Sequence, residues 1–291
     1  MTEVLRFAAF TEDPSGGNPA GIVLDASGLD ADQMQAIAVE VGYSETAFLV
    51  AAGDRSYDVR YFAPSAEVSF CGHATIATGV ALAERHGAGR FLLHSKVGDV
   101  PLDVEVDDRG RPRAVLTSVE PALRALPDDD LAALLRALRW SPSDLDPRLP
   151  VRVAYAGAWH PVIAVMSRAR LADLSYDFDA LQQLMSAWGW TTIQLIWRET
   201  PTLFHARDPF AVGGVVEDPA TGAAAAALGH YLRELRLVDL PARITVRQGD
   251  DMGRPSVLIV DVDGTDPRIK VSGHAVHMNA PIASPRPASG P

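Results

Sequence analysis

The chain has 291 residues, of which 47% are apolar and 22% charged, a composition that excludes an intrinsically disordered or collagen-like protein. The length is typical of about two domains of roughly 150 residues each. The net charge of −11 gives a surface that repels phosphate backbones, and the single cysteine, Cys71, rules out an internal disulfide and a thiolate-rich zinc site.

The first ten residues include Glu3 and no long apolar run, so no signal peptide is expected. The longest stretch without a formal charge, residues 68–83, contains Ser, Gly, His and Thr, which does not fit a membrane span. These features predict a cytoplasmic protein with neither a membrane nor a nucleic-acid partner.

Strand signals outnumber helix signals along the chain. Strands are expected at residues 5–10, 22–24, 46–50, 57–62, 90–93, 100–106, 114–118, 244–248, 256–262 and 269–279, within 151–165 on both sides of Gly157, and twice between residue 188 and Val215. Helices are expected at about residues 72–85, 128–139, 178–188 and 220–236, and a further one between a capping box at Asp30 and Gln33 and a stop at Gly42. Loops are expected at residues 13–19 and 141–150, a linker at 120–127 and a frayed tail at 283–291.

No regular strand–helix–strand alternation is present, which disfavours a doubly wound parallel sheet. The segment from His73 to Leu82 can be laid on the segment from Pro219 to Leu228, so that five small or apolar positions coincide. Small residues on every face allow a helix to be closely surrounded. We therefore expect an α+β fold of two similar halves, each a curved sheet wrapped around one buried helix, although chance similarity of two alanine-rich helices is the alternative.

Glu45 is the first candidate for acid–base chemistry. It follows the helix stop at Gly42 and begins an apolar strand, so its carboxyl is expected to be partly desolvated and its pKa raised toward neutrality. The alternative is a solvated residue at a helix–strand joint.

The starts of the two buried helices are the other candidates. Cys71-Gly72-His73 opens the first helix, where backbone amides can hold an anion and an imidazole can relay a proton. Asp218-Pro219 precedes the second helix, with proline suited to a first helical position. The alternatives are a capping histidine beside a buried thiol, and Asp218 acting only as a helix cap.

Other site types lack sequence support. His274 and His277 are three apart on an expected strand and face opposite sides, and the remaining histidines lack ligand spacing, so no metal site is expected. Nucleotide-binding, serine-hydrolase and zincin motifs are missing from the sequence. The glycines of the turn at residues 248–256 are expected to serve backbone geometry.

Five short motifs in the same order resemble the PhzF family of phenazine biosynthesis, within the diaminopimelate epimerase-like fold. They are Gly17-Asn18-Pro19-Ala20, Ser44-Glu45-Thr46-Ala47-Phe48, Cys71-Gly72-His73-Ala74-Thr75, Glu217-Asp218-Pro219-Ala220-Thr221-Gly222 and Met252-Gly253-Arg254-Pro255-Ser256. The resemblance implies two pseudo-symmetric halves with a cleft between them: residues 1–120 with 273–291, which hold Glu45 and the helix at Gly72, and residues 121–272, which hold the helix at Asp218.

The resemblance also implies the chemistry. Glu45 would be the general acid and base, and His73 and Asp218 would orient and polarise the substrate. Substrate binding would involve Asn18, Ser44, Gly72, Thr221, Gly222 and Ala223. The expected activity is a cofactor-independent isomerase that moves a proton between carbons of a small carboxylated ring compound; homodimers are common in the family.

Two departures bear on the substrate. Ala223 stands where family members commonly carry serine, which removes a hydroxyl that could touch the substrate. Cys71 occupies the place of one of two thiols in related epimerases, and no second cysteine exists for two-thiol epimerisation. A single-base epimerase and a non-catalytic small-molecule binding protein on the same scaffold remain as alternatives.

Overall fold

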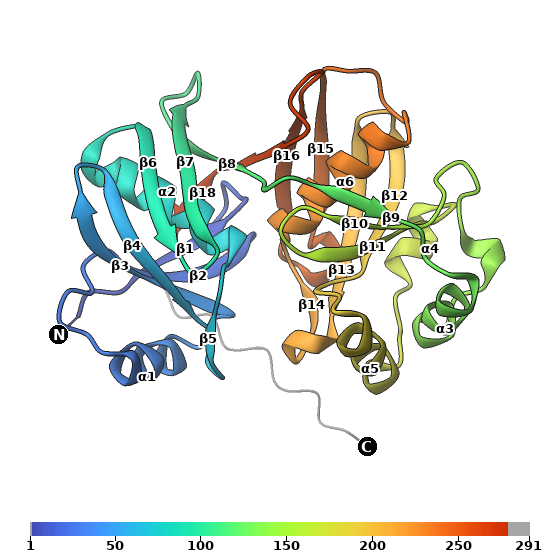
Figure 1. Cartoon of the computed structure of the whole chain (residues 1–291), viewed down its shortest axis with the longest axis horizontal. Coiled ribbons are helices and arrows are strands. Elements are labelled where there is room, and N and C mark those ends of the chain that lie inside the picture. The colour runs from blue at the N-terminus through green and yellow to red at the C-terminus, as the bar shows by residue number, and fades with distance from the viewer. Residues whose placement is uncertain (1, 279–291) are drawn as a thin grey trace. The chain divides into compact units, whose positions relative to one another are not determined.

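The computed structural model describes residues 2–278, so the expected tail lies outside the described residues. The described chain forms two compact units: unit 1, residues 2–117 and 272–278, and unit 2, residues 118–271 (Figure 1). No helix within residues 2–278 is long and apolar enough to cross a membrane.

Unit 1 is one mixed sheet with two helices. Its elements are β1 Leu5–Ala9, β2 Asn18–Val23, α1 Ala31–Val41, β3 Glu45–Gly53, β4 Ser56–Phe62, β5 Glu67–Val68, α2 Gly72–His86, β6 Gly89–Ser95, β7 Gly98–Val106, β8 Pro112–Thr117 and β18 Ala275–His277. Hydrogen bonding orders the strands β18-β1-β2-β3-β4-β6-β7-β8, with β5 also on β4. The pairs β2–β3 and β4–β6 are parallel, and the others are antiparallel.

Unit 2 repeats this order. Its elements are β9 Ala122–Arg124, α3 Asp128–Leu138, η1 Pro142–Asp144, β10 Arg152–Tyr155, β11 Trp159–Ala164, α4 Arg168–Ala172, α5 Phe178–Trp188, β12 Gln194–Thr200, β13 Leu203–Phe210, η2 Ala211–Gly213, β14 Val215–Asp218, α6 Gly222–Glu234, β15 Ala242–Gln248, η3 Asp250–Met252 and β16 Ser256–Val262, and β17 Ile269–Gly273 spans the unit boundary. The strands run β9-β10-β11-β12-β13-β15-β16, with parallel pairs β11–β12 and β13–β15 and with β14 on β13. The same alternation of parallel and antiparallel pairs in both units confirms the predicted α+β repeat.

Each sheet encloses one helix. Every residue of α2 from His73 to Ala83 is buried, and in α6 so are Gly222 and residues 224–232. Gly79 and Gly229 lie at equivalent places in the two helices, where an added Cβ would be 3.0 Å from Leu102 and 2.8 Å from Val260. Glycine thus lets each sheet approach its helix closely.

The two helices correct the predicted alignment of the repeat. They begin at Gly72 and Gly222, an offset of 222 − 72 = 150 residues, whereas the sequence alignment of Ala74 with Ala220 used 220 − 74 = 146. The structural offset pairs His73 with Ala223, and Gly79 with Gly229.

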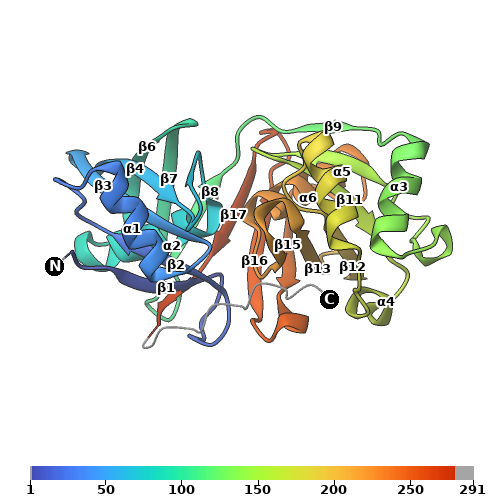
Figure 2. The ribbon, with the colours of Figure 1, turned by 90° about the horizontal axis from the view of Figure 1, so that it is seen from below.

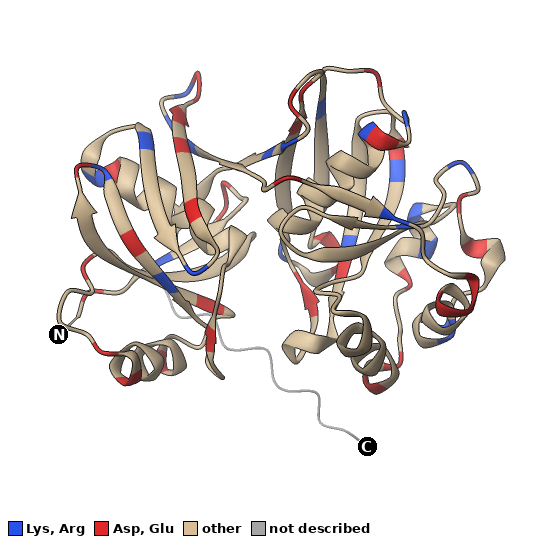
Figure 3. Ribbon diagram, viewed as in Figure 1, with Lys and Arg blue, Asp and Glu red and all other residues tan. Residues whose placement is uncertain are grey.

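The remaining larger helices cover the outer faces of the sheets. In unit 1, Met34 and Ala38 of α1 pack on Val23, Phe48 and Phe62. In unit 2, α3 and α5 lie next to each other (Figure 2) and share an apolar cluster that includes Leu138, Leu181, Met185 and Trp190. Charged residues of both signs are interspersed along the ribbon of each unit (Figure 3).

Several local predictions are confirmed. Asp30 and Gln33 form the capping box of α1, Gly42 ends α1 in the left-handed conformation, and α5 spans the predicted residues. The linker predicted at residues 120–127 contains a strand that was not expected, because residues 122–124 form β9 against Tyr155, Ala154 and Val153 of β10. Likewise β2 begins at Asn18 rather than Ile22, because Asn18 already pairs with Ala9.

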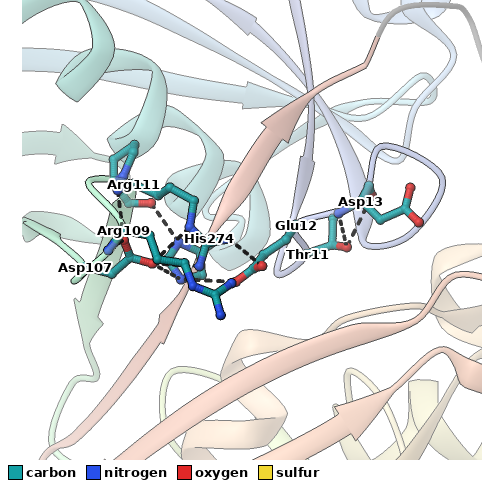
Figure 4. Close-up of polar contacts among 8 residues, drawn as sticks. Thr11, Glu12, Asp13, Asp107, Arg109, Arg111 and His274 are labelled. Carbon is teal, nitrogen blue, oxygen red and sulfur yellow. Dashed lines mark hydrogen bonds and ion pairs between the residues drawn. The ribbon is translucent and has the colours of Figure 1, made fainter.

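A polar network anchors the segment between β17 and β18 within unit 1. His274 Nδ1 donates to the carbonyl of Pro112 at 3.0 Å, and its Nε2 lies 3.7 Å from both Glu12 and Asp107. Arg111 contacts both of these carboxylates (Figure 4). His277 instead pairs with Glu84 at 2.8 Å, so the two histidines have separate partners, as their spacing predicts.

Candidate active site

Glu45 lies at the first position of β3. Gly42 ends α1 with φ +69°, which turns the chain directly into the strand. Glu45 is in register with Ala20 of the parallel neighbour β2, and its side chain is 14% exposed. Backbone hydrogen bonding on β3 therefore fixes a largely buried carboxyl beside the start of α2.

His73, in the first turn of α2, is the nearest imidazole to this carboxyl. Its Nε2 lies 3.5 Å from Oε2 of Glu45 and 3.3 Å from Oγ of Ser44. Its Nδ1 lies 3.3 Å from Sγ of Cys71. Ser44, Glu45, Cys71 and His73 thus form one compact cluster in unit 1.

Burial raises the pKa of the Glu45 carboxyl above its ordinary value of 4.5. Hydrogen bonds from Ser44 and from Cys71 act in the opposite direction, because they stabilise the carboxylate. A raised pKa makes this carboxyl a better proton acceptor than an exposed glutamate, which is what acid–base chemistry at carbon needs.

Buried side chains of unit 1 stabilise the start of α2. Thr75 Oγ1 donates to the carbonyl of Cys71 at 2.7 Å, and the buried Tyr61 hydroxyl contacts the same Oγ1 at 2.7 Å. The Cys71 side chain does not cap the helix. The amides of the first turn, beginning at Gly72, have no partner within the helix and carry its positive dipole end.

The start of α6 in unit 2 is organised around Asp218. Thr221 Oγ1 donates to Asp218 Oδ2 at 2.5 Å. Gln248 Nε2 donates to the carbonyl of Asp218 at 2.7 Å, and Gln248 Oε1 accepts from the amide of Thr221 at 3.2 Å. Asp218 is thus not the cap of α6: the N-cap residue is Thr221, whose side chain bonds to Asp218 instead of to the helix.

The turn that follows Gln248 depends on glycine, as predicted. Gly249 has φ +78°, and a Cβ there would lie 2.8 Å from the carbonyl of Pro219, just before α6. Gly222 is the first residue of α6 and is buried, and Ala223 follows it with partial exposure.

The remaining predicted residue, Asn18, is buried on β2, two residues before the register partner of Glu45. Sequence reasoning did not assign a site role to Cys71, Gln248 or Asp208. The position of Gln248 directly before Gly249 and a tight turn was the sequence feature that could have pointed to a site role for Gln248. For Asp208, which pairs with Asp218 across β13 and β14, the sequence carries no signal.

The unit 1 cluster could also hold a metal ion. One ligand atom each from Glu45, Cys71 and His73 lies within 4.8 Å of the others. Thiolate, imidazole and carboxylate are a donor set that suits zinc. The sequence predicts no metal site, because the histidines lack ligand spacing and Glu45 lies 26 positions before Cys71.

Comparisons with known proteins match almost the whole chain. The family model PhzC-PhzF, described as phenazine biosynthesis-like protein, matches residues 7–280. An uncharacterised isomerase of Clostridium acetobutylicum is 33% identical over 284 residues, covering 92% of this chain and 93% of the relative. The trans-2,3-dihydro-3-hydroxyanthranilate isomerase of Pseudomonas chlororaphis is 31% identical over 276 residues, covering 92% and 94%.

Solved structures show the same fold. A PhzF-family phenazine biosynthesis protein of Bacillus anthracis has a TM-score of 0.85 at 27% identity, covering 95% of this chain and 96% of that one. A probable proline racemase of Agrobacterium radiobacter has a TM-score of 0.64 at 12% identity, covering 94% and 90%. The second likeness concerns the fold alone, which is that of the diaminopimelate epimerase-like proteins.

Proposed function

Because the chain belongs to the phenazine biosynthesis-like PhzC-PhzF family and is an isomerase of that family, we propose that it moves a proton between carbons of a small carboxylated ring substrate with Glu45 as the single acid and base. The observation that carries this proposal is the largely buried Glu45 carboxyl, whose pKa burial raises, beside the start of α2.

Glu45 would act in two steps. Its carboxylate takes a proton from one substrate carbon, which leaves negative charge delocalised toward the substrate carboxyl group. The resulting carboxylic acid returns the proton to another carbon, so that Glu45 ends ionised as it began and no cofactor is consumed.

The neighbours of Glu45 would support both steps. Ser44 and Cys71 stabilise the carboxylate through hydrogen bonds, which limits the rise of its pKa. His73, 3.5 Å from the Glu45 carboxyl, would donate to or polarise a polar group of the substrate. The first-turn amides of α2, at the positive end of its dipole, would stabilise the negative charge that develops.

In unit 2, Asp218 would orient an amino or hydroxyl group of the substrate. The hydrogen bond from Thr221 fixes one of the carboxyl oxygens of Asp218. Gly222 and Ala223 are the first residues of α6, and the side chain of the N-cap residue Thr221 does not accept a hydrogen bond from the helix amides. Asn18 and Ser44 are further proposed binding residues. We also propose the homodimer that the family resemblance implies.

Incubation in heavy water tests the activity. The first probe is trans-2,3-dihydro-3-hydroxyanthranilate, the substrate in the name of the Pseudomonas chlororaphis relative. Further probes are cyclic carboxylates that carry an amino or hydroxyl group. Deuterium bound to carbon, with a changed double-bond position, supports the isomerase. Label with inverted configuration at one carbon indicates a single-base epimerase, and binding without label in any probe indicates a non-catalytic protein.

A further inference from the structure

Asp208 is a second carboxyl at the start of α6. It lies on β13 directly opposite Asp218 in the antiparallel pair with β14, and it is completely buried. The neighbouring register pair is Pro209 with Glu217, after which the pairing shifts. Two aspartates that face each other across strands place their side chains on the same side of the sheet.

The hydrogen-bond partners of Asp208 are neutral. Thr192 Oγ1 donates to Asp208 Oδ1 at 3.2 Å. With its amide nitrogen turned toward the carboxyl, Gln194 donates to both oxygens, at 3.0 and 3.2 Å. Within residues 2–278 no cationic side chain forms an ion pair with Asp208.

The charged groups around Asp208 do not offset a negative charge on it. Burial raises the pKa of the Asp208 carboxyl well above its ordinary value of 3.8, and Asp218 and Glu217 on β14 raise it further. Arg207, which precedes Asp208 on the same strand, is engaged by both oxygens of Glu217, at 2.5 and 3.0 Å, and lies 4.0 Å from Asp251 of η3.

His160 of β11, which contacts Thr192, is a further buried titratable group, and it is neutral. Burial lowers its pKa to about 4. Its Nδ1 lies 2.9 Å from Thr192 Oγ1, whose single proton is given to Asp208. Nδ1 of His160 therefore carries the imidazole proton and donates to Thr192.

The Thr221 hydroxyl is engaged by Asp218. It has one proton, which it donates to Asp218 Oδ2 at 2.5 Å, while it accepts from Gln248 Nε2 at 3.1 Å. Because a hydroxyl donates only one hydrogen bond, this proton stabilises Asp218 and leaves Asp208 with the neutral donors Thr192 and Gln194.

We propose that Asp208 is a neutral carboxylic acid in the working protein and a positioning residue for Asp218, which it faces across the β13–β14 pair. With Asp208 neutral, no second negative charge repels the Asp218 side chain, which keeps the orientation given by its hydrogen bond from Thr221. The neutral state of Asp208 does not depend on the proposed function. Its role in positioning Asp218 during turnover rests on that proposed function.

Infrared spectroscopy of protein labelled with ¹³C in the aspartate side-chain carboxyl groups tests the protonation directly. The label shifts aspartate bands only, so a protonated Glu45 does not interfere. We expect one carbonyl band of a neutral aspartic acid at neutral pH in the wild type, its loss in Asp208→Asn, and its retention in the control Asp239→Asn at an exposed position of the same unit. No neutral aspartic acid band in the wild type, or a band that survives in Asp208→Asn, overturns the proposal.

Turnover then tests the positioning role. Asn has the shape of Asp and resembles its neutral form, so Asp208→Asn should keep the deuterium exchange rate within about threefold of the wild type, whereas Asp208→Ala should lose about tenfold or more. Asp208→Asn should also leave the pH profile unchanged. Equal losses in both variants contradict the role. If the wild type exchanges no probe, the proposed function fails while the infrared result still decides the state of Asp208.

Discussion

The His73 imidazole and the Glu45 carboxyl are neighbours, with 3.5 Å between Nε2 and Oε2, although the residues come from a helix and a strand 28 positions apart (73 − 45). The contact exists because β3 begins at Glu45 and α2 begins at Gly72, so each side chain lies at an element terminus. The proton-accepting carboxyl of Glu45 and the imidazole of His73 therefore lie close enough to contact the same substrate molecule.

The pH dependence of exchange should reflect the environment of Glu45. The carboxylate is the form that accepts a proton, so exchange falls as the pH drops through the pKa of Glu45, which burial raises above 4.5. Ser44→Ala removes a hydrogen bond that lowers this pKa, and the acidic limb of kcat/KM should move to higher pH. The measurement is the pH profile of both proteins, with Ser95→Ala on β6 as the control. A limb that stays in place, or moves to lower pH, contradicts the assigned role of Ser44.

Ala223 should limit activity toward trans-2,3-dihydro-3-hydroxyanthranilate. Ala223→Ser restores the hydroxyl that family members commonly carry at a partly exposed position in the first turn of α6. One added hydrogen bond to the substrate is expected to raise kcat/KM by about tenfold. Steady-state kinetics of both proteins check this expectation, and an unchanged or lower value means that Ala223 does not determine the substrate.

Chelation should leave the reaction intact, because the proposed proton transfer needs the free Glu45 carboxylate. Dialysis against EDTA is expected to preserve the exchange rate. Added Zn²⁺ is expected to inhibit it, since Glu45, Cys71 and His73 offer ligand atoms within 4.8 Å of one another. Loss of exchange on chelation, restored by metal, would show that the reaction depends on a metal.

The close approach of sheet and helix predicts a stability effect at Gly229. A Cβ there would lie 2.8 Å from Val260 and 2.9 Å from Ile269, so Gly229→Ala should lower the free energy of unfolding by about 1–3 kcal/mol despite the better helix propensity of alanine. Urea denaturation measures it. Gly264→Ala is the control, because no heavy atom lies within 4 Å of that Cβ position. Equal midpoints for the two variants would mean that the helix has room at Gly229.

Local signals in the sequence were sufficient for the elements that local interactions define. The Asp30 capping box and the Gly42 stop are hydrogen bonds and dihedral preferences within one helix, and they were read correctly. The strand β9 was missed because its hydrogen bonds go to β10, about thirty residues away, and residues 122–124 carry no pattern of their own.

The same distinction applies to the site. Glu45, His73 and Asp218 are proposed as site residues from motifs at element boundaries. Gln248 and Asp208 reach Asp218 through strand pairing and a turn, which no short motif encodes. Cys71 was read as a buried thiol, and its contacts with His73 and Glu45 follow from where α2 starts.

Substitution of Glu45 tests the central claim most directly. Glu45→Gln keeps the shape of the side chain and removes its proton-accepting oxygen, and Glu40→Gln makes the same change at an exposed position of α1. With folding of both variants checked by circular dichroism, deuterium incorporation from heavy water should fall by at least about a hundredfold in Glu45→Gln and stay at the wild-type rate in Glu40→Gln. Incorporation at the wild-type rate in Glu45→Gln would contradict the account.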